Sequence, residues 1–589
     1  MSLIFFVSFA FFFSLLILMN AKISEACMTV LVGKKASSTG EILVAHNEDA
    51  PGRFTMQTHL VKKQRRHPGT KIKFEPELSE LSLSSTRTSL FWSEAKTFSK
   101  DDSDSSFCDF YVNGYGVVIC SNNCAYSRED EPELTNGGIG YGLRRLVSES
   151  SRTASEALDL ACKLVEKYGY ASSGRSYAFA DKDEIYVMQI VHGKHYAIQR
   201  VPDDEVCVIP NHYTIHDADK KARGYDELVN YAIKRGWYKP EDGAFDFKRV
   251  YQAEDSYGEE KNTHRHVRAF EILLEMDLSG LLKQKWEPLP FSIKPSRKVT
   301  IETLKKILRT HFEGTSSYSS DSDNPHFSKP LTVCNSDTLE STIAEIRHNP
   351  DRVILRRALG RPCFSPYVVW YMGINELPGG YEDMNPDSSL ANHFHTKPGD
   401  MDYRDNAWFR AMEVQGACDI LCGDKETGQI VRSKIAEFES HEEEKLRTLD
   451  SQIELRLRNQ PDIARAMMDG AVLSWSEEAE ECLNGIKNEL GIIVGEALDS
   501  VIAGEVFKIR IHDSAFKVTE CICGPSYKPQ SEWSNCIKID DNGKYTELDF
   551  DSGKWVDDAV PCFMDLYMKM TDENGKIHAG TVRIQIQKF

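Results

Sequence analysis

The sequence lacks two features that would point to particular partners. After Met19 it has no apolar stretch near the roughly 20 residues that a bilayer-spanning helix needs, so we expect no stable membrane insertion of that part. It also lacks an excess of basic residues, with 71 Lys and Arg against 90 Asp and Glu and a net charge of −19. This balance argues against nucleic acid or an anionic membrane surface as a partner.

Two short motifs are missing as well. There is no Asn-x-Ser/Thr sequon, so glycosylation neither supports nor opposes export. There are no Cys-x-x-Cys pairs with the histidine pattern of a zinc site, so we predict no metal and no other cofactor. The 15 cysteines favour disulfides in an oxidising compartment, and their odd number leaves one thiol over. Three pairs are close in sequence, although spacing does not fix connectivity: Cys120 and Cys124, Cys418 and Cys422, and Cys521 and Cys523.

The N-terminus has the pattern of a secretory signal peptide at residues 1–26. Residues 3–19 are almost all apolar, and Ser24 and Ala26 place small residues at positions −3 and −1 of a cleavage site. An uncleaved anchor is the alternative, since no lysine or arginine precedes the apolar run. Cleavage after Ala26 would leave Cys27 first, with a thiol nucleophile and an α-amino base on one residue. A structural cysteine beside a signal peptide is the plain alternative.

Length and composition indicate a soluble protein of two to four domains. The chain has 589 residues, 41% hydrophobic and 27% charged. We predict a catalytic region at residues 27–489, which includes a charged helical segment at 436–488. From about residue 490 short β runs alternate with Gly, Asn, Asp and Pro, so residues 490–589 are predicted to form a β-rich accessory domain.

Strands and helices alternate in the catalytic region. We predict strands at 28–32 and 41–45, then a strand-turn-strand unit around residues 111–119. Thr153 and Glu156 fit the capping box of a helix that ends at Gly169. Four further strands are predicted at 176–180, 184–191, 195–201 and 205–209. This order predicts a layered α+β fold rather than a doubly wound parallel sheet.

A polar cluster, residues 46–49, follows the apolar residues 42–44. If a turn at Gly40 folds the chain back, strand pairing brings this cluster near Cys27. A carboxylate there can hold the α-amino group, and a cation or donor can favour the thiolate. An ordinary polar strand end is the alternative.

Several motifs in order resemble one enzyme family. They are residues 27–36 with Gly40 and the cluster 46–49, residues 113–117, residues 138–146, and residues 201–211. This series resembles the PepD-type cysteine dipeptidases, which are N-terminal-nucleophile hydrolases like penicillin V acylase and bile-salt hydrolase. The likeness covers Cys27 to about Ile215 and continues more weakly to Trp370.

The resemblance implies a fold and roles for five residues. The fold would be a four-layer αββα core, here with helical extensions and the C-terminal β domain. Cys27 would be nucleophile and base, Asp49 would orient the amine, and the side chains of Asn113 and Asn211 would stabilise the oxyanion. Turn formation is the alternative for both asparagines, because each neighbours Gly or Pro.

His46 departs from the pattern that the resemblance implies, because related acylases and many such dipeptidases carry arginine there. Histidine titrates near pH ~6.5 and is cationic mainly in acid. We therefore expect activity to favour an acidic compartment or medium. We interpret His212, beside Asn211, as a surface histidine rather than a wall of the site.

The sequence therefore predicts a secreted or lysosomal-type cysteine dipeptidase, located outside the cell or in a lysosomal or vacuolar lumen, that cleaves short peptides. Two alternatives stay open: an N-acyl amide hydrolase of the penicillin and bile-salt type, and a non-catalytic, disulfide-rich binding protein. Small peptides are the predicted partners, and a homo-oligomer is left open.

Overall fold

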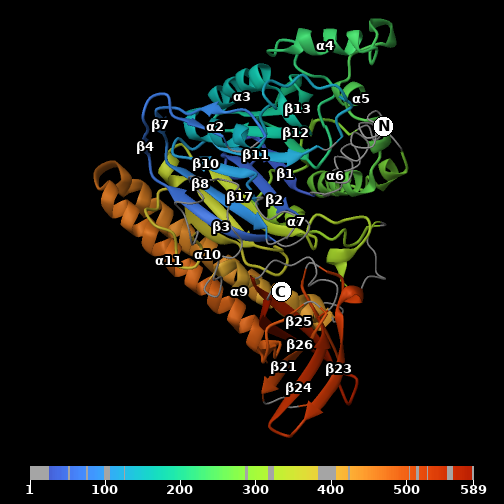
Figure 1. Ribbon diagram of the computed structural model, residues 1–589. Helices are drawn as coiled ribbons and strands as arrows, with labels where there is room; N and C mark the ends of the chain where they lie inside the picture. Colours follow the sequence, from blue (N-terminus) through green and yellow to red (C-terminus); the bar gives the residue numbers. More distant parts are fainter. Residues whose placement is uncertain are drawn as a thin grey trace, which may run out of the picture.

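The computed structural model describes residues 26–50, 54–73, 77–97, 106–124, 126–284, 289–315, 317, 324–382, 406–421, 425–502, 504–512, 516–526, 528–552 and 562–586 (Figure 1). The predicted signal peptide, apart from Ala26, lies outside these residues. Among the helices in the described ranges, none combines the length and apolarity needed to cross a membrane.

The first sheet contains the strand that follows Cys27. In spatial order its strands are β16 (Ser292–Ile293), β15 (Val206–Ile209), β1 (Met28–Val32), β2 (Ile42–Asp49), β17 (Thr338–Ile346), β18 (Ile354–Leu359) and β19 (Val368–Tyr371). Neighbouring strands are antiparallel, and β1 lies between β15 and β2. Every residue of β1 and β2 is buried, because both faces of the sheet are covered.

The second sheet is also antiparallel. Its strands are β14 (Tyr196–Arg200), β13 (Ile185–Gly193), β12 (Tyr170–Ala180), β11 (Val118–Asn123), β10 (Phe110–Asn113), β8 (Leu90–Thr97) and β3 (Phe54–Val61), with β9 (Ser106–Phe107) paired to β8. Two short two-stranded pairs lie apart from it: β4 (Gln64–Arg65) with β7 (Thr86–Arg87), and β5 (Lys71–Ile72) with β6 (Leu81–Ser82).

The two sheets stack face to face between layers of helix. Leu31 and Val44 of the first sheet share a buried core with Val118 and Ala178 of the second. The outer face of the second sheet packs against α2 (Gly142–Ser150) and α3 (Ala154–Tyr168), which lie above it in Figure 1. The outer face of the first sheet packs against α6 (Glu260–Leu274) and α7 (Ile301–Arg309). The layers run α, β, β, α, and the predicted α+β class is confirmed.

Local signals in the sequence explain individual elements. The Thr153 side chain accepts a hydrogen bond from the Glu156 amide, and helix α3 begins at the next residue and ends before Gly169. The predicted turn between β10 and β11 forms around Gly116, whose φ of 79° is a conformation that glycine adopts without strain.

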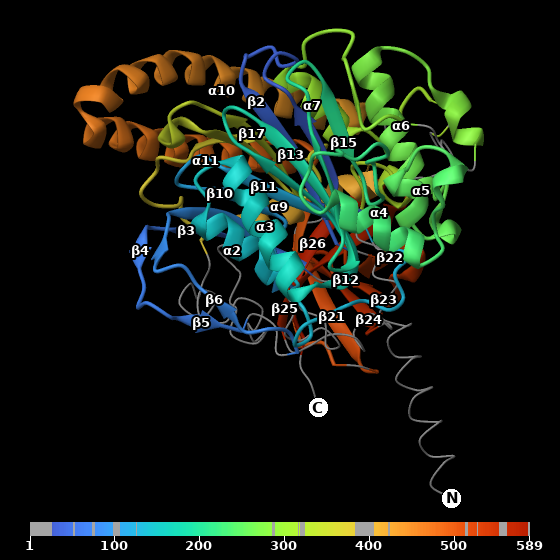
Figure 2. The same cartoon turned by 90° about the horizontal axis from the view of Figure 1, so that it is seen from above.

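The remaining helices extend the core. Their bounds are α4 (Tyr225–Lys234), α5 (Phe247–Tyr251), α9 (Ala407–Leu421), α10 (Lys425–Asn459) and α11 (Pro461–Glu489). Helices α10 and α11 form a long antiparallel pair along β19, projecting to one side in Figure 2.

A closed barrel follows α11. Its strands are β20 (Ile493–Ala497), β21 (Val506–His512), β24 (Tyr545–Asp551), β23 (Ser534–Asp541), β22 (Val518–Gly524), β25 (Cys562–Asp572) and β26 (Ile577–Ile586). It lies below the sandwich in Figure 1 and packs against α9, where the Tyr567 hydroxyl donates to the Met412 carbonyl at 2.8 Å.

Candidate active site around Cys27

Cys27 stands directly before β1, at one end of the first sheet. Strand β1 pairs with β2 so that Met28 faces Asn47 and Thr29 faces His46, which sets Cys27 beside Glu48. The Cys27 sulfur is buried, and it lies 3.5 Å from Glu48 Oε1 and 3.5 Å from both the backbone nitrogen and oxygen of Asp49. The predicted approach of the 46–49 cluster to Cys27 by strand pairing is confirmed.

The Asp49 carboxylate is buried and only partly satisfied. Its Oδ2 accepts a hydrogen bond from Asn335 Nδ2 at 2.9 Å, whereas Oδ1 is buried and has no hydrogen-bond partner in the part of the chain that the structure describes. Burial raises the pKa of Asp49 well above its usual value, and the nearby Arg265 guanidinium acts in the opposite direction. An additional cation at Oδ1 would stabilise the ionised carboxylate.

His46 belongs to a hydrogen-bonded chain between the two sheets. Thr29 Oγ1 donates to Asn122 Oδ1 at 2.6 Å, so its oxygen accepts from His46 Nδ1 at 2.9 Å. This arrangement assigns the Nδ1 proton to His46 and turns Nε2 toward Glu48 Oε2, at 3.6 Å. A second proton on His46 would therefore face the carboxylate that contacts Cys27.

Glu48 links the hydrogen-bonded series of Asn122, Thr29 and His46 to a buried group of charged side chains around Asp109. Burial raises the pKa of Glu48, the neighbouring Asp109 raises it further, and His46 opposes both. Burial also acts to raise the pKa of Asp109, but Arg144 at 2.9 Å and Arg175 at 3.0 Å outweigh it and hold that pKa below its usual value. The sulfur of Cys27 thus faces a carboxyl group whose pKa is raised.

Arg265 on α6 is a residue of the site that the sequence interpretation missed. It is fully buried and donates to the carbonyl oxygens of Ala26 and, at 3.2 Å, of Cys27. Burial lowers the pKa of Arg265, while Asp49 and Cys27 act to raise it. The one available signal was an arginine on the apolar side of an amphipathic helix, which by itself does not point to a site.

Asn211 lies at the same site through Arg265. Its Oδ1 accepts from Arg265 Nη2 at 2.8 Å, and its Nδ2 donates to the Asn123 carbonyl at 3.0 Å. Asn262, on the same helix as Arg265, accepts from the Asn211 backbone amide at 3.1 Å. Asn211 is therefore rigidly held beside the peptide that precedes Cys27.

The structure does not bring Asn113 to Cys27. Both hydrogens of its side-chain amide are donated to carbonyls, of Ser148 at 3.0 Å and Ser151 at 2.7 Å, and its oxygen accepts from the amides of the hairpin turn. Asn113 closes the hairpin at one end of β11, while Asn122, at the other end, contacts Thr29. The strand between them rises by about 3.3 Å per residue, which keeps Asn113 away from β1. Turn formation, the alternative interpretation, accounts for Asn113.

His212 is buried rather than on the surface, so that interpretation was wrong. Its Nε2 lies 3.2 Å from His266 Nδ1, and burial lowers the pKa of His212 well below its usual value.

The expected disulfides are not formed among the described cysteines. Thirteen cysteines, including Cys120, Cys124, Cys521 and Cys523, are thiols in the part of the chain that the structure describes. Cys422 and the side chain of Cys562 lie outside that part.

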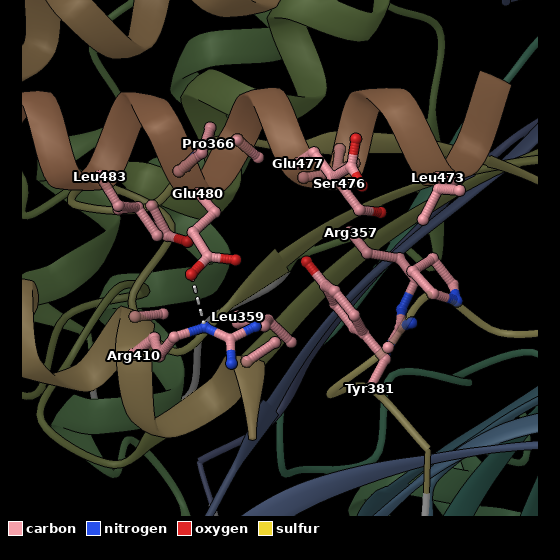
Figure 3. Close-up of a pocket in the computed structure, with 17 residues that line it drawn as sticks. Arg357, Leu359, Pro366, Tyr381, Arg410, Leu473, Ser476, Glu477, Glu480 and Leu483 are labelled. Carbon is pink, nitrogen blue, oxygen red and sulfur yellow. Dashed lines mark ion pairs between the residues drawn. The ribbon is translucent and has the colours of Figure 1, made fainter. Parts of the chain in front are cut away.

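A pocket of about 280 Å³ lies between α9, α11 and β18 (Figure 3). Arg410 pairs with Glu480 at 3.0 Å across it, and Tyr381 and Arg357 face it from the other side. Its lining comes from segments other than β1 and β2, so it is distinct from the surroundings of Cys27.

Comparison with known proteins gives one family. The model of peptidase family C69 matches residues 26–401. A probable dipeptidase of Latilactobacillus sakei is 25% identical over 389 residues, which cover 63% of this chain and 79% of that protein. A probable dipeptidase of Salmonella dublin is 26% identical over 378 residues, covering 61% and 84%. A dipeptidase of Bifidobacterium longum is 24% identical over 400 residues, covering 61% and 73%.

Among solved structures, a mutant of the conjugated bile acid hydrolase from Clostridium perfringens is similar to 58% of this chain and 91% of its own. The sequence identity is 12% and the TM-score is 0.28, which is too low to support a functional inference.

Proposed function

The chain belongs to peptidase family C69, and we propose that it is a dipeptidase whose nucleophile is the Cys27 thiol, exposed when residues 1–26 are removed. One observation carries the proposal. The peptide before Cys27 is buried, Arg265 donates to its carbonyl oxygen and to Asn211 Oδ1, and the Asp49 carboxylate interacts electrostatically with the same guanidinium. Acyl transfer to an N-terminal cysteine needs such groups, because a carboxylate can hold the α-amino base and fixed donors can stabilise the oxyanion.

Removal of residues 1–26 would create the base beside the thiol. The new α-amino group would lie next to Asp49, whose Oδ1 is buried and has no hydrogen-bond partner among the described residues. An α-amino group with a pKa near ~7.7–8 and a thiol near ~8.5 exchange a proton easily at neutral pH. Held by Asp49, the amine would take the thiol proton and later give it to the leaving amine.

Arg265 and Asn211 would then receive the substrate. The guanidinium that holds the Ala26 carbonyl in the uncleaved chain becomes available to a substrate carbonyl and to the oxyanion that forms as the sulfur attacks. Asn211 orients that guanidinium through its Oδ1. The resulting thioester would be hydrolysed by water activated by the same amine.

We also propose that the N-terminal segment directs the chain to the exterior or to a lysosomal or vacuolar lumen. The support is the apolar run followed by small residues at Ser24 and Ala26.

The first test joins the mature N-terminus to substrate choice. We expect N-terminal sequencing of the mature protein to begin at Cys27, and we expect that protein to hydrolyse dipeptides faster than penicillin-type or bile-salt-type acyl amides. A variant chain in which residues 1–26 are retained should be inactive, because its Cys27 nitrogen is an amide and not a base. A mature chain that begins after Cys27 would overturn the mechanism, and faster acyl amide hydrolysis would favour the alternative substrate class.

The pH dependence tests the role of His46. We expect wild-type kcat/KM to be highest in acid and to fall between about pH 5 and 8, where a histidine loses its charge. A protonated His46 would place a cation 3.6 Å from Glu48, whose carboxyl group contacts the Cys27 sulfur, so loss of that charge would change the electrostatics beside the nucleophile. His46→Arg keeps a cation at all these pH values, so its profile should be flatter. Identical pH–rate profiles for the two proteins would refute this role.

A further inference from the structure

Four potential metal ligands from separate segments converge away from Cys27. His311 follows α7, His326 lies in a short 3-10 helix (Pro325–Phe327), Cys334 precedes β17 and Cys363 follows β18. One ligand atom of each lies within 4.8 Å of those of the other three, and His326 Nε2 is 3.1 Å from Cys363 Sγ. His326 and Cys334 are fully buried.

A zinc ion fits this spacing. Zinc binds Cys sulfur at about 2.3 Å and His nitrogen at about 2.0–2.1 Å, so a tetrahedron of these ligands has edges of about 3.3–3.8 Å. The four atoms need only a small contraction from their present limit of 4.8 Å to reach it. Two thiolates and two neutral imidazoles carry a double negative charge, which a divalent cation cancels in a buried place.

Each imidazole is held by a carboxylate on its far nitrogen. His326 Nδ1 lies 2.7 Å from Asp419 Oδ1, and His311 Nδ1 lies 2.9 Å from Glu313 Oε1. Both contacts leave Nε2 as the ligand atom, and the His311 side chain interacts with the Cys334 thiol. Carboxylates that orient histidines in this way are typical of zinc sites. Arg361 Nη2 forms an ion pair with Asp419 Oδ2 at 2.6 Å, which balances the charge of that carboxylate.

We propose that His311, His326, Cys334 and Cys363 bind one zinc ion. Four protein ligands complete the tetrahedron and leave no open position for water or substrate, so the role is structural. Sulfur and imidazole ligands exclude calcium and magnesium, which take oxygen ligands.

The zinc ion would hold in place the loop that contains Cys334, and this loop hydrogen-bonds to Asn47 and Asp49 near Cys27. Cys334 stands between Val333, whose carbonyl accepts from Asn47 at 3.2 Å, and Asn335, which donates to Asp49 at 2.9 Å. Asp419 adds α9 to the elements that meet here. Metal binding therefore joins α7, the loop before β17, the end of β18 and α9 at one point.

Two other uses of these residues make different chemical predictions. Cys334 and Cys363 could join as a disulfide, which would leave both histidines without a role. Cys363, His326 and Asp419 could act as a second thiol nucleophile with its base, which would leave Cys334 and His311 unexplained. Zinc uses all four residues.

The test measures metal directly in the purified full chain and does not depend on peptidase activity. We expect elemental analysis and native mass spectrometry to find a single zinc ion per chain. X-ray absorption at the zinc edge should show two sulfur neighbours at about 2.3 Å and two nitrogen neighbours at about 2.0–2.1 Å. A strong chelator together with a thiol-modifying mercurial should release the zinc and lower Tm.

Matched substitutions identify the ligands. Cys334→Ser and His326→Asn should abolish stoichiometric zinc, while Cys482→Ser, at a half-buried cysteine on α11, should retain it. If the ligand variants do not fold, the absorption spectrum of the wild-type chain still decides between zinc with two sulfurs and zinc with another ligand set. A zinc-free chain lighter by two hydrogens, with a Cys334–Cys363 peptide on mapping, would overturn the proposal. So would a zinc-free chain with a thiolate at Cys363 that is alkylated rapidly.

Discussion

Replacing Cys27 with alanine is expected to reduce kcat/KM for dipeptides by at least about 10³-fold while the chain stays folded. The substitution removes the sulfur that would form the thioester. It leaves Arg265 and Asn211 in place to bind substrate and Asp49 in place to hold the α-amino group. Cys27 is buried, so the smaller side chain leaves only a small cavity. Initial rates, with Tm and circular dichroism as checks on folding, measure the effect.

Two companion variants separate the nucleophile from a general cysteine effect. Cys207→Ala removes an equally buried thiol on β15, where Cys207 pairs with Leu31, and it should retain activity. Cys27→Ser keeps a weaker nucleophile beside the same amine and should fall between wild type and Cys27→Ala. All variants need the same mapped N-terminus. Dipeptide hydrolysis by Cys27→Ala at the wild-type rate would remove Cys27 from the mechanism.

The fold follows from local patterns that one sequence contains. The strands at 28–32 and 206–209 and the helix between Thr153 and Gly169 lie where their periodicity and caps predict them. The strand after Gly40 continues through the polar residues to Asp49, further than predicted, because the sheet buries both faces of its polar end. The cysteines were interpreted as disulfides because an exported chain would enter an oxidising compartment, but spacing along the sequence does not show whether two sulfurs meet.

Part of the site could be predicted because strand pairing is local. One turn at Gly40 is enough to bring Glu48 and Asp49 to Cys27. Arg265 reaches the same place from a helix that is distant in the sequence, and no nearby motif marks it. For Asn113 the sequence did suggest a role, but the structure does not place it at the site: this asparagine stands at a hairpin turn and its side chain donates to the Ser148 carbonyl. The roles of Cys27, Asp49, Asn211 and His46 remain predictions.

The four residues of the proposed zinc site also could not be predicted from the sequence, because they are far apart along the chain. A search for Cys-x-x-Cys pairs assumes that ligands come from adjacent turns, as in short zinc modules. His311, His326, Cys334 and Cys363 instead come from four connections around the first sheet, and only the folded sheet places them together. The carboxylates that orient the histidines, Glu313 and Asp419, are equally scattered.

Arg265→Lys is expected to lower kcat/KM by about 10²–10³-fold, the cost of losing a fixed donor to a developing oxyanion. Lysine keeps the charge opposite Asp49, so the carboxylate is not left without a cation. It cannot reproduce the forked contacts by which Arg265 reaches Asn211 Oδ1 at 2.8 Å and the Cys27 carbonyl at 3.2 Å. Because the oxyanion exists only in the transition state, kcat should fall more than KM rises.

The matched control is Arg297→Lys, the same exchange at a side chain that is 79% exposed and pairs with Glu275. It should leave both constants unchanged, because an exposed ion pair contributes little and lies outside the site. Steady-state kinetics on dipeptides, with Tm for each protein, separates the two cases. If Arg265→Lys changed KM alone, Arg265 would bind the ground state and the oxyanion would need another donor. If it changed neither constant while the protein stayed folded, Arg265 would serve only to hold the peptide before Cys27 in the uncleaved chain.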